Sequence, residues 1–151
     1  MDYKIVEKEA FKVVVKAKRF KDTAEERPSD KIPDFRKDFF AQGLDKKLTA
    51  DWAYTSSFDE KTQTFKYGIG CPQDMVKKMQ DDFEIWDIPA SKWIVFKLVG
   101  DPATEIPKMW EHIFIKGLPT PEYETINSID MEYLGDQDYC ELWVSVREKL
   151  K

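Results

Sequence analysis

The stretch DKIPDFRKDFFAQG (residues 30–43) recurs in altered form as TEIPKMWEHIFIKG (residues 104–117), with one constant offset between matching positions. In both copies an Ile-Pro pair opens the stretch, and apolar residues then recur at helical spacing. Proline is tolerated in the first turn of a helix, where its missing N–H costs little. Gly43 and Gly117 close the two copies, as expected for helix ends. The pattern predicts two amphipathic helices in a duplicated chain.

Extended patterns flank both predicted helices. AFKVVVK (10–16) and ASKWIVFK (90–97) precede them and share an Ala-x-Lys start before an apolar run. Two more extended stretches follow each helix and meet at turn residues that suit hairpins. These stretches are residues 50–59 and 63–70 in the first half, and residues 124–134 and 138–146 in the second.

The sequence therefore predicts an α+β fold made of two β-α-β-β halves with pseudo-twofold symmetry. One helix per half would cover one face of an antiparallel sheet, which leaves the other face for a ligand cleft. We place the half-repeats at about residues 1–70 and 83–147, joined by a connector at residues 71–82, in one domain of residues 1–151.

Composition narrows the classes of function. The chain has 24 basic and 29 acidic residues and a net charge of −5, which argues against direct DNA binding. It has no apolar run of transmembrane length and no signal-peptide pattern, so we expect a cytoplasmic protein without membrane association. The two cysteines, Cys71 and Cys140, form no CxxC motif. We expect no disulfide, no metal site and no cofactor.

The stretch DYCELWVSV (residues 138–146) is the strongest candidate for a site. Its alternation places Tyr139, Glu141 and Trp143 on one side of a strand, so that a carboxylate lies between two large aromatic residues. Such a carboxylate loses hydration, and a cation held over the rings would offset that cost. The same geometry suits a general acid or base. A third interpretation needs no ligand: Glu141 pairs with a cross-strand lysine or accepts a hydrogen bond from a tyrosine.

The duplication extends this candidate site. With the offset of the helices, Tyr67 corresponds to Glu141, and the faces of these strands that point away from the helices would form a concave surface between the halves. Small-molecule pockets favour such places. Gly68 and Gly70 would then face the helices. Three more aromatic residues are available to the concave surface, namely Trp52, Tyr54 and Trp93.

Several segments resemble the GyrI-like family over about residues 1–147. They are IPDFRKDFFAQG (32–43), YGIG (67–70), FEIWDIPASKWIVFK (83–97), MWEHIF (109–114) and YCELWVSV (139–146). These bacterial effector-binding domains, related to DNA gyrase inhibitory protein, follow DNA-binding helices in AraC-type and MerR-type multidrug-sensing regulators and also occur alone. The resemblance implies bulky aromatic or cationic ligands and a buried glutamate on the last strands that receives the charge. Glu141 matches that position by motif.

We therefore expect a stand-alone domain, without DNA-binding helices, that captures lipophilic, aromatic or cationic compounds. Glu141 would supply the charge, and the aromatic residues would supply hydrogen bonds and apolar walls. These residues are Tyr67, Tyr139, Trp143, Trp93, Trp52 and Tyr54. One alternative is a hydrolase of electrophilic, cyclopropane-type molecules in which Glu141 activates water and Tyr67 donates a proton. Another is a protein-binding module that contacts gyrase or a regulator. We expect a monomer or a weak dimer.

Overall fold

The computed structural model describes residues 2–135 and 138–150. Its helices are α1 (Pro28–Ala41) and α2 (Pro102–Lys116), and single 3-10 turns lie at Leu44–Lys46 and Gln73–Met75. Its strands are β1 (Tyr3–Lys8), β2 (Phe11–Lys21), β3 (Trp52–Thr55), β4 (Thr64–Pro72), β5 (Glu84–Ile88), β6 (Ser91–Val99), β7 (Tyr123–Thr125), β8 (Asp130–Tyr133) and β9 (Tyr139–Glu148).

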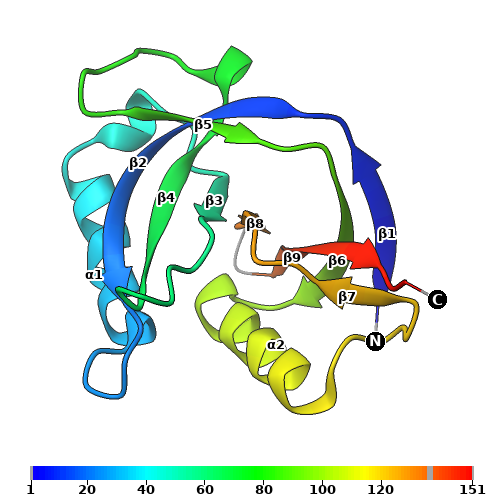
Figure 1. Ribbon diagram of the computed structural model, residues 1–151. Helices are drawn as coiled ribbons and strands as arrows, with labels where there is room; N and C mark the ends of the chain where they lie inside the picture. Colours follow the sequence, from blue (N-terminus) through cyan, green and yellow to red (C-terminus); the bar gives the residue numbers. More distant parts are fainter. Residues whose placement is uncertain (1, 136–137, 151) are drawn as a thin grey trace.

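These strands form one antiparallel sheet in the order β1-β6-β9-β8-β3-β4-β2-β5, with β7 added alongside β9 (Figure 1). The order is symmetric about the central β8–β3 pair, so the predicted α+β fold with duplicated halves is confirmed. Each half also begins with a strand that the predicted β-α-β-β pattern lacks. This strand is exchanged between the halves, because β1 pairs with β6 and β5 pairs with β2.

Both helices cover the same face of the sheet, each over its own half. Helix α1 buries Phe35 and Phe39 against the first half, and α2 buries Ile106, Met109 and Ile113 against the second. The buried positions follow the helical repeat that the sequence showed. Gly43 follows α1 by two residues and Gly117 caps α2 directly, with positive φ angles of 69° and 80°. The prediction that Pro33 and Pro107 lie in the first turn is wrong, because the helices begin at Pro28 and Pro102 and both prolines lie inside them.

The opposite face of the sheet is concave and carries a third core. In Figure 1 the sheet curls around this face, and no helix of the described chain covers it. The curvature brings side chains from both halves into contact with one another. The buried members of this core are Val13, Val15, Tyr54, Ile88, Trp93, Val95, Met131 and Trp143.

Tyr67 does not lie on the concave face, and its predicted place beside Glu141 is wrong. Its side chain is buried on the helix-facing side, in the core beneath α1. Gly68 and Gly70 lie on the concave face instead, opposite to the prediction. A Cβ at Gly68 would meet the side chain of Val15, which belongs to the concave core.

The strand registers give the reason for this error. Val15 pairs with Gly70, and its sequence match in the second half, Val95, pairs with Trp143. Gly70 is therefore the structural equivalent of Trp143. Two residues earlier in each strand, Gly68 is the structural equivalent of Glu141. The offset of the last strand thus differs by one residue from the offset of the helices. A shift of one residue moves a strand side chain to the other face.

Candidate functional site

Glu141 lies within a row of cross-strand neighbours on the concave face, with Lys97 of β6 opposite it on one side but not within 4.0 Å of its carboxylate. Tyr133 of β8 lies opposite Glu141, and Trp52 of β3 lies opposite Tyr133. The ring of Trp52 is 5.2 Å from that of Tyr133 and 5.6 Å from that of Trp143, measured between centroids. The rings of Tyr133 and Tyr139 are 6.4 Å apart. We call these four aromatic residues around the glutamate the aromatic rim.

Both carboxylate oxygens of Glu141 accept hydrogen bonds from members of the rim. The hydroxyl of Tyr139 donates to Oε2 at 2.5 Å, and Nε1 of Trp143 donates to Oε1 at 2.9 Å. The bond to Glu141 and partial burial raise the pKa of Tyr139 to about 12, so this hydroxyl stays a donor. Within the described part of the chain, no lysine or arginine nitrogen lies within 4.0 Å of this carboxylate.

A second Glu-x-Trp pair on the same face offers an internal comparison. Nε1 of Trp86 donates to Oε1 of Glu84 at 3.1 Å, as Trp143 does to Glu141. The same oxygen of Glu84 also accepts a bond from Nζ of Lys66 at 2.9 Å. Burial would raise the pKa of Glu84, but the bonds from Lys66 and Trp86 lower it below its usual value. At this pair, the protein itself supplies a cation to the carboxylate.

Two of the predicted wall residues lie on the predicted face but inside the core. Trp93 is 0% exposed and Tyr54 is 1% exposed, whereas Trp52, Tyr139 and Glu141 keep partial exposure. The two buried residues pack against the aromatic rim from the core side: Trp93 contacts Trp143, and Tyr54 stacks on Trp52. The predicted aromatic residues, Tyr67 excepted, are thus brought together. The open cleft among them stays a prediction.

Sequence reasoning missed Tyr133, and it also missed a buried polar group on the helix-facing side. In this group Arg36 of α1 approaches Tyr67 of β4 and Glu132 of β8. Burial lowers the pKa of Arg36, but attraction to Tyr67 and Glu132 outweighs it and the pKa is raised. Burial raises the pKa of Glu132, and Arg36 opposes that rise. The alternation of residues 130–133 could have placed Glu132 on the helix-facing side, opposite in direction to Tyr133.

Asp130, at the start of β8, provides a testable pH dependence. Its Oδ1 accepts bonds from the backbone N–H and the hydroxyl of Ser145, both at 2.9 Å. Burial raises the pKa of Asp130 to about 6, and the negative charge of Glu132 acts in the same direction. The bonds from Ser145 lower the pKa but do not offset the effect of burial. Because this folded-state pKa exceeds the unfolded value of about 4, protonated Asp130 favours folding. Its stabilising contribution is therefore full below about pH 4 and is lost as the pH rises through about 6.

We expect Asp130→Asn to be more stable than wild type by about 2–3 kcal/mol at pH 7.5 and to differ little at pH 4. The amide oxygen can accept both bonds from Ser145, while the cost of a buried charge disappears. Urea denaturation at the two pH values measures the difference. Asp34→Asn, on the exposed surface of α1, serves as the control and should match wild type at both. A stability difference for Asp130→Asn that is the same at both pH values would contradict the assignment.

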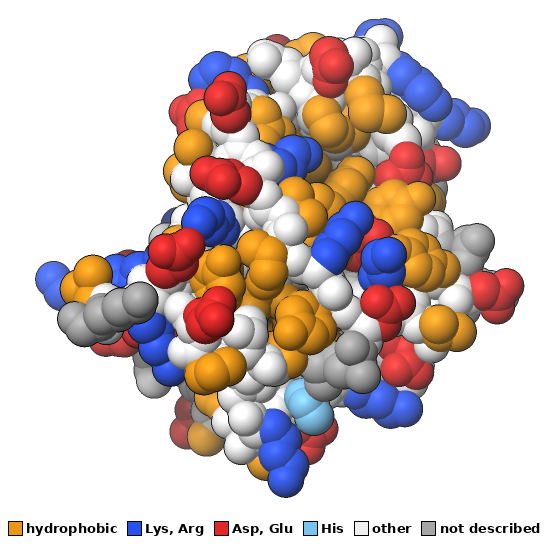
Figure 2. Space-filling view, turned by 90° about the vertical axis from the view of Figure 1, so that its right-hand side faces the viewer, with side chains coloured by type: hydrophobic (Ala, Val, Ile, Leu, Met, Phe, Trp, Pro, Cys, Tyr) orange, Lys and Arg blue, Asp and Glu red, His pale blue; other side chains and the backbone are white. Residues whose placement is uncertain are grey.

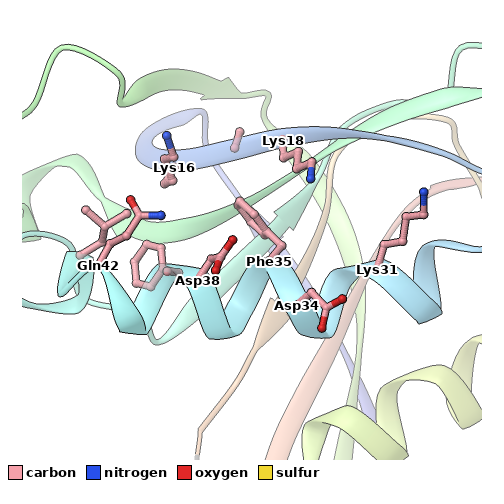
Figure 3. Close-up of a pocket in the computed structure, with 10 residues that line it drawn as sticks. Lys16, Lys18, Lys31, Asp34, Phe35, Asp38 and Gln42 are labelled. Atoms are coloured by element: carbon pink, nitrogen blue, oxygen red, sulfur yellow. The ribbon is translucent and has the colours of Figure 1, made fainter.

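Two hollows on the surface are lined by residues outside the aromatic rim, and Lys8, which lines one of them, also lies over the Trp143 ring. One of about 460 Å³ lies between α1 and β2 (Figure 3), and one of about 870 Å³ lies where the end of β1 meets β9. On the side that carries β1 and β6, acidic, basic and apolar side chains are interleaved (Figure 2).

No trio of His, Cys, Asp or Glu in the described residues could hold a metal ion. None of the described helices is both long and apolar enough to cross a membrane.

The domain is thus one antiparallel sheet of two duplicated halves, with two helices on one face and a concave core on the other. The chain belongs to the family of integron-associated effector-binding proteins (Cass2), whose family model matches residues 4–146. This match confirms the GyrI-like relationship that the sequence indicated. The chain is therefore a small-molecule-binding domain by family and fold.

Solved structures share the fold. The structure of SAV2435 bound to tetraphenylphosphonium has a TM-score of 0.76 and 14% identity, over 97% of this chain and 94% of that one. The integron cassette protein VCH_CASS2 of Vibrio cholerae has a TM-score of 0.71 and 18% identity, over 96% and 95%. EcmrR in its DNA complex has a TM-score of 0.60 and 14% identity, over 99% of this chain and 58% of EcmrR. Comparison with curated protein sequences gives no match.

Proposed function

We propose that this domain binds lipophilic aromatic cations, with Glu141 as the charge partner and the aromatic rim as the surrounding wall. The observation that carries the proposal is the contrast between the two Glu-x-Trp pairs. Glu84 accepts a bond from the ammonium of Lys66, whereas Glu141 is surrounded by aromatic rings and has no lysine or arginine of the described chain within 4.0 Å. The geometry at Glu141 thus suits a cation that comes from outside the chain.

Two further observations support the chemical class. The ammonium of Lys8 lies 5.6 Å from the centroid of the Trp143 ring, so a face of this ring already accommodates a cation. A cation–π contact contributes about 0.5–2 kcal/mol, and Coulomb attraction to Glu141 adds to it. SAV2435, which shares the fold, is bound to tetraphenylphosphonium, a cation with four aromatic rings.

The residues of the aromatic rim have different roles in this proposal. Tyr139 and Trp143 orient the carboxylate through their hydrogen bonds, while Trp52 and Tyr133 offer ring surface beside it. Tyr54 and Trp93 support the rim from behind. Tyr67 has no part, since it lies on the other face of the sheet. The hydrolase alternative paired Glu141 with Tyr67, and the structure separates these two side chains in the same way.

The test is titration with tetraphenylphosphonium, followed by tryptophan fluorescence and by calorimetry. We expect Glu141→Gln to weaken binding about 10–100-fold, which corresponds to about 1.5–3 kcal/mol for a charge-assisted contact. Glutamine keeps an acceptor for Trp143, so the rim should stay intact. Triphenylphosphine oxide, which is neutral, should bind both proteins equally.

Glu84→Gln is the matched control, because it changes the same motif on the same face. It should leave the affinity for tetraphenylphosphonium unchanged. Equal affinity of wild type and Glu141→Gln, or no binding by wild type, would show that the charge role is wrong. A loss seen only in Glu132→Gln would instead place the charge partner on the helix-facing side.

A further inference from the structure

Strand β2 is paired with a neighbouring strand along nearly the whole of one edge but along only part of the other. It pairs with β4 along Val13–Lys21, but with β5 only along Phe11–Val15. From Lys16 to Lys21, no strand of residues 2–135 and 138–150 lies on the β5 side of β2. The last six residues of β2, Lys16 to Lys21, therefore form an open edge of the sheet.

The register shows which residues expose their backbone groups there. The N–H of Asp22, next in line after β2, donates to the carbonyl of Gln63 on the β4 side at 2.9 Å. In an antiparallel ladder, alternate residues turn their N–H and C=O to opposite sides. Ala17, Arg19 and Lys21 therefore present their N–H and C=O groups to the open edge.

The open edge borders the hollow of about 460 Å³ beside α1. Lys16, Ala17 and Lys18 line it from the strand. Asp34 and Asp38 line it from the helix, and Phe35 reaches from α1 toward β2 between the two walls (Figure 3). The hollow thus gives room for side chains beside an unpaired row of main-chain donors and acceptors.

The charge of this edge distinguishes it from the rest of an acidic chain. Lys18, Arg19 and Lys21 have no carboxylate within 4.0 Å in the described residues. Lys16, where β5 leaves β2, pairs with Asp82 at 2.7 Å. Asp82 lies in the segment that leads into β5, so an acidic residue of a neighbouring segment already docks on this row of basic residues.

We propose that the open edge of β2 binds an extended acidic segment of a partner protein by strand addition. The segment would continue the line of β5, and its main chain would pair with Ala17, Arg19 and Lys21. Its side chains alternate, so one set faces Phe35 in the hollow and the other faces Arg19. A second copy of the same edge is disfavoured, because basic residues would then face basic residues. This proposal is independent of ligand binding at Glu141.

The experiment uses the full chain, labelled with nitrogen-15, and two hexapeptides of alternating sequence. One alternates valine with glutamate, and the other alternates valine with lysine. We expect the glutamate peptide to slow hydrogen exchange at the amides of Ala17, Arg19 and Lys21. Its binding should weaken with added salt, because exposed charges are screened.

Ala17→Pro removes one outward N–H without touching the β4 ladder, since proline is tolerated at strand edges. It should weaken peptide binding about tenfold, as expected for the loss of one main-chain hydrogen bond. Arg19→Glu should also weaken peptide binding. This variant replaces Ala17→Pro in the test if the proline variant does not fold. Tetraphenylphosphonium binding should be unchanged in both variants.

Three outcomes overturn the proposal. The first is no binding of the glutamate peptide at about 1 mM, a concentration that reveals even weak complexes. The second is equal binding of the lysine peptide, or of the glutamate peptide by both variants. The third is self-association of the wild type that Ala17→Pro abolishes, which would make a second copy of this chain the occupant.

Discussion

Arg36→Met is expected to lower the free energy of unfolding by about 1–3 kcal/mol, the usual cost of leaving a buried polar group without a compensating partner. Burial raises the pKa of Glu132, and the positive charge of Arg36 lowers it. The two residues come from opposite halves of the chain. Without Arg36, Glu132 would have to remain charged in a low dielectric or take up a proton. Urea denaturation at pH 7.5 measures the loss.

The double variant Arg36→Met with Glu132→Leu tests the assignment. Replacing both members of a buried pair by apolar residues is often neutral or stabilising, so we expect it to recover most of the loss. The single variant should also gain stability as the pH falls, because a protonated Glu132 no longer needs a counter-ion. A loss below about 1 kcal/mol in Arg36→Met, or a double variant as unstable as the single, would show that the two charges do not depend on each other.

Gly70→Ala is expected to abolish folding, with a loss of more than about 4 kcal/mol. A Cβ at this position would lie 1.9 Å from the backbone carbonyl oxygen of Val14 and 2.9 Å from its carbonyl carbon. Neither atom belongs to a side chain that could rotate away, so strands β2 and β4 would have to separate. Circular dichroism and thermal denaturation of the purified variant measure the effect.

Gly43→Ala is the matched control for a glycine of a different kind. A Cβ there meets nothing within 4 Å, but the residue has a φ of 69°. We expect a cost of only about 1–2 kcal/mol, from the left-handed backbone alone. A Gly70→Ala protein that melts within a few degrees of wild type would mean that the two strands tolerate a wider spacing than the structure has.

The helices and most strands could be predicted because their signals are local. Apolar residues at helical spacing and a glycine after the last turn indicate α1 and α2 within a short stretch of sequence. The prolines of the Ile-Pro pairs did not mark the helix starts, which lie earlier, at Pro28 and Pro102. The alternation around Glu141 likewise placed Tyr139 and Trp143 on its side of β9. Even the duplication needed only a comparison of the chain with itself. By contrast, β1 and β5 pair with strands of the other half, so no local window reveals their partners.

The sequence by itself determined the α+β fold, the two halves and the face on which Glu141 lies. Only the tertiary structure decided that Tyr67 lies beneath α1, that the charge of Arg36 acts on Glu132 and that β2 keeps an open edge. The physical reason is that periodicity fixes which residues of one element share a side, whereas strand register fixes which residues of different elements meet. Because side chains alternate along a strand, an offset of one residue between the halves was enough to exchange Tyr67 for Gly68.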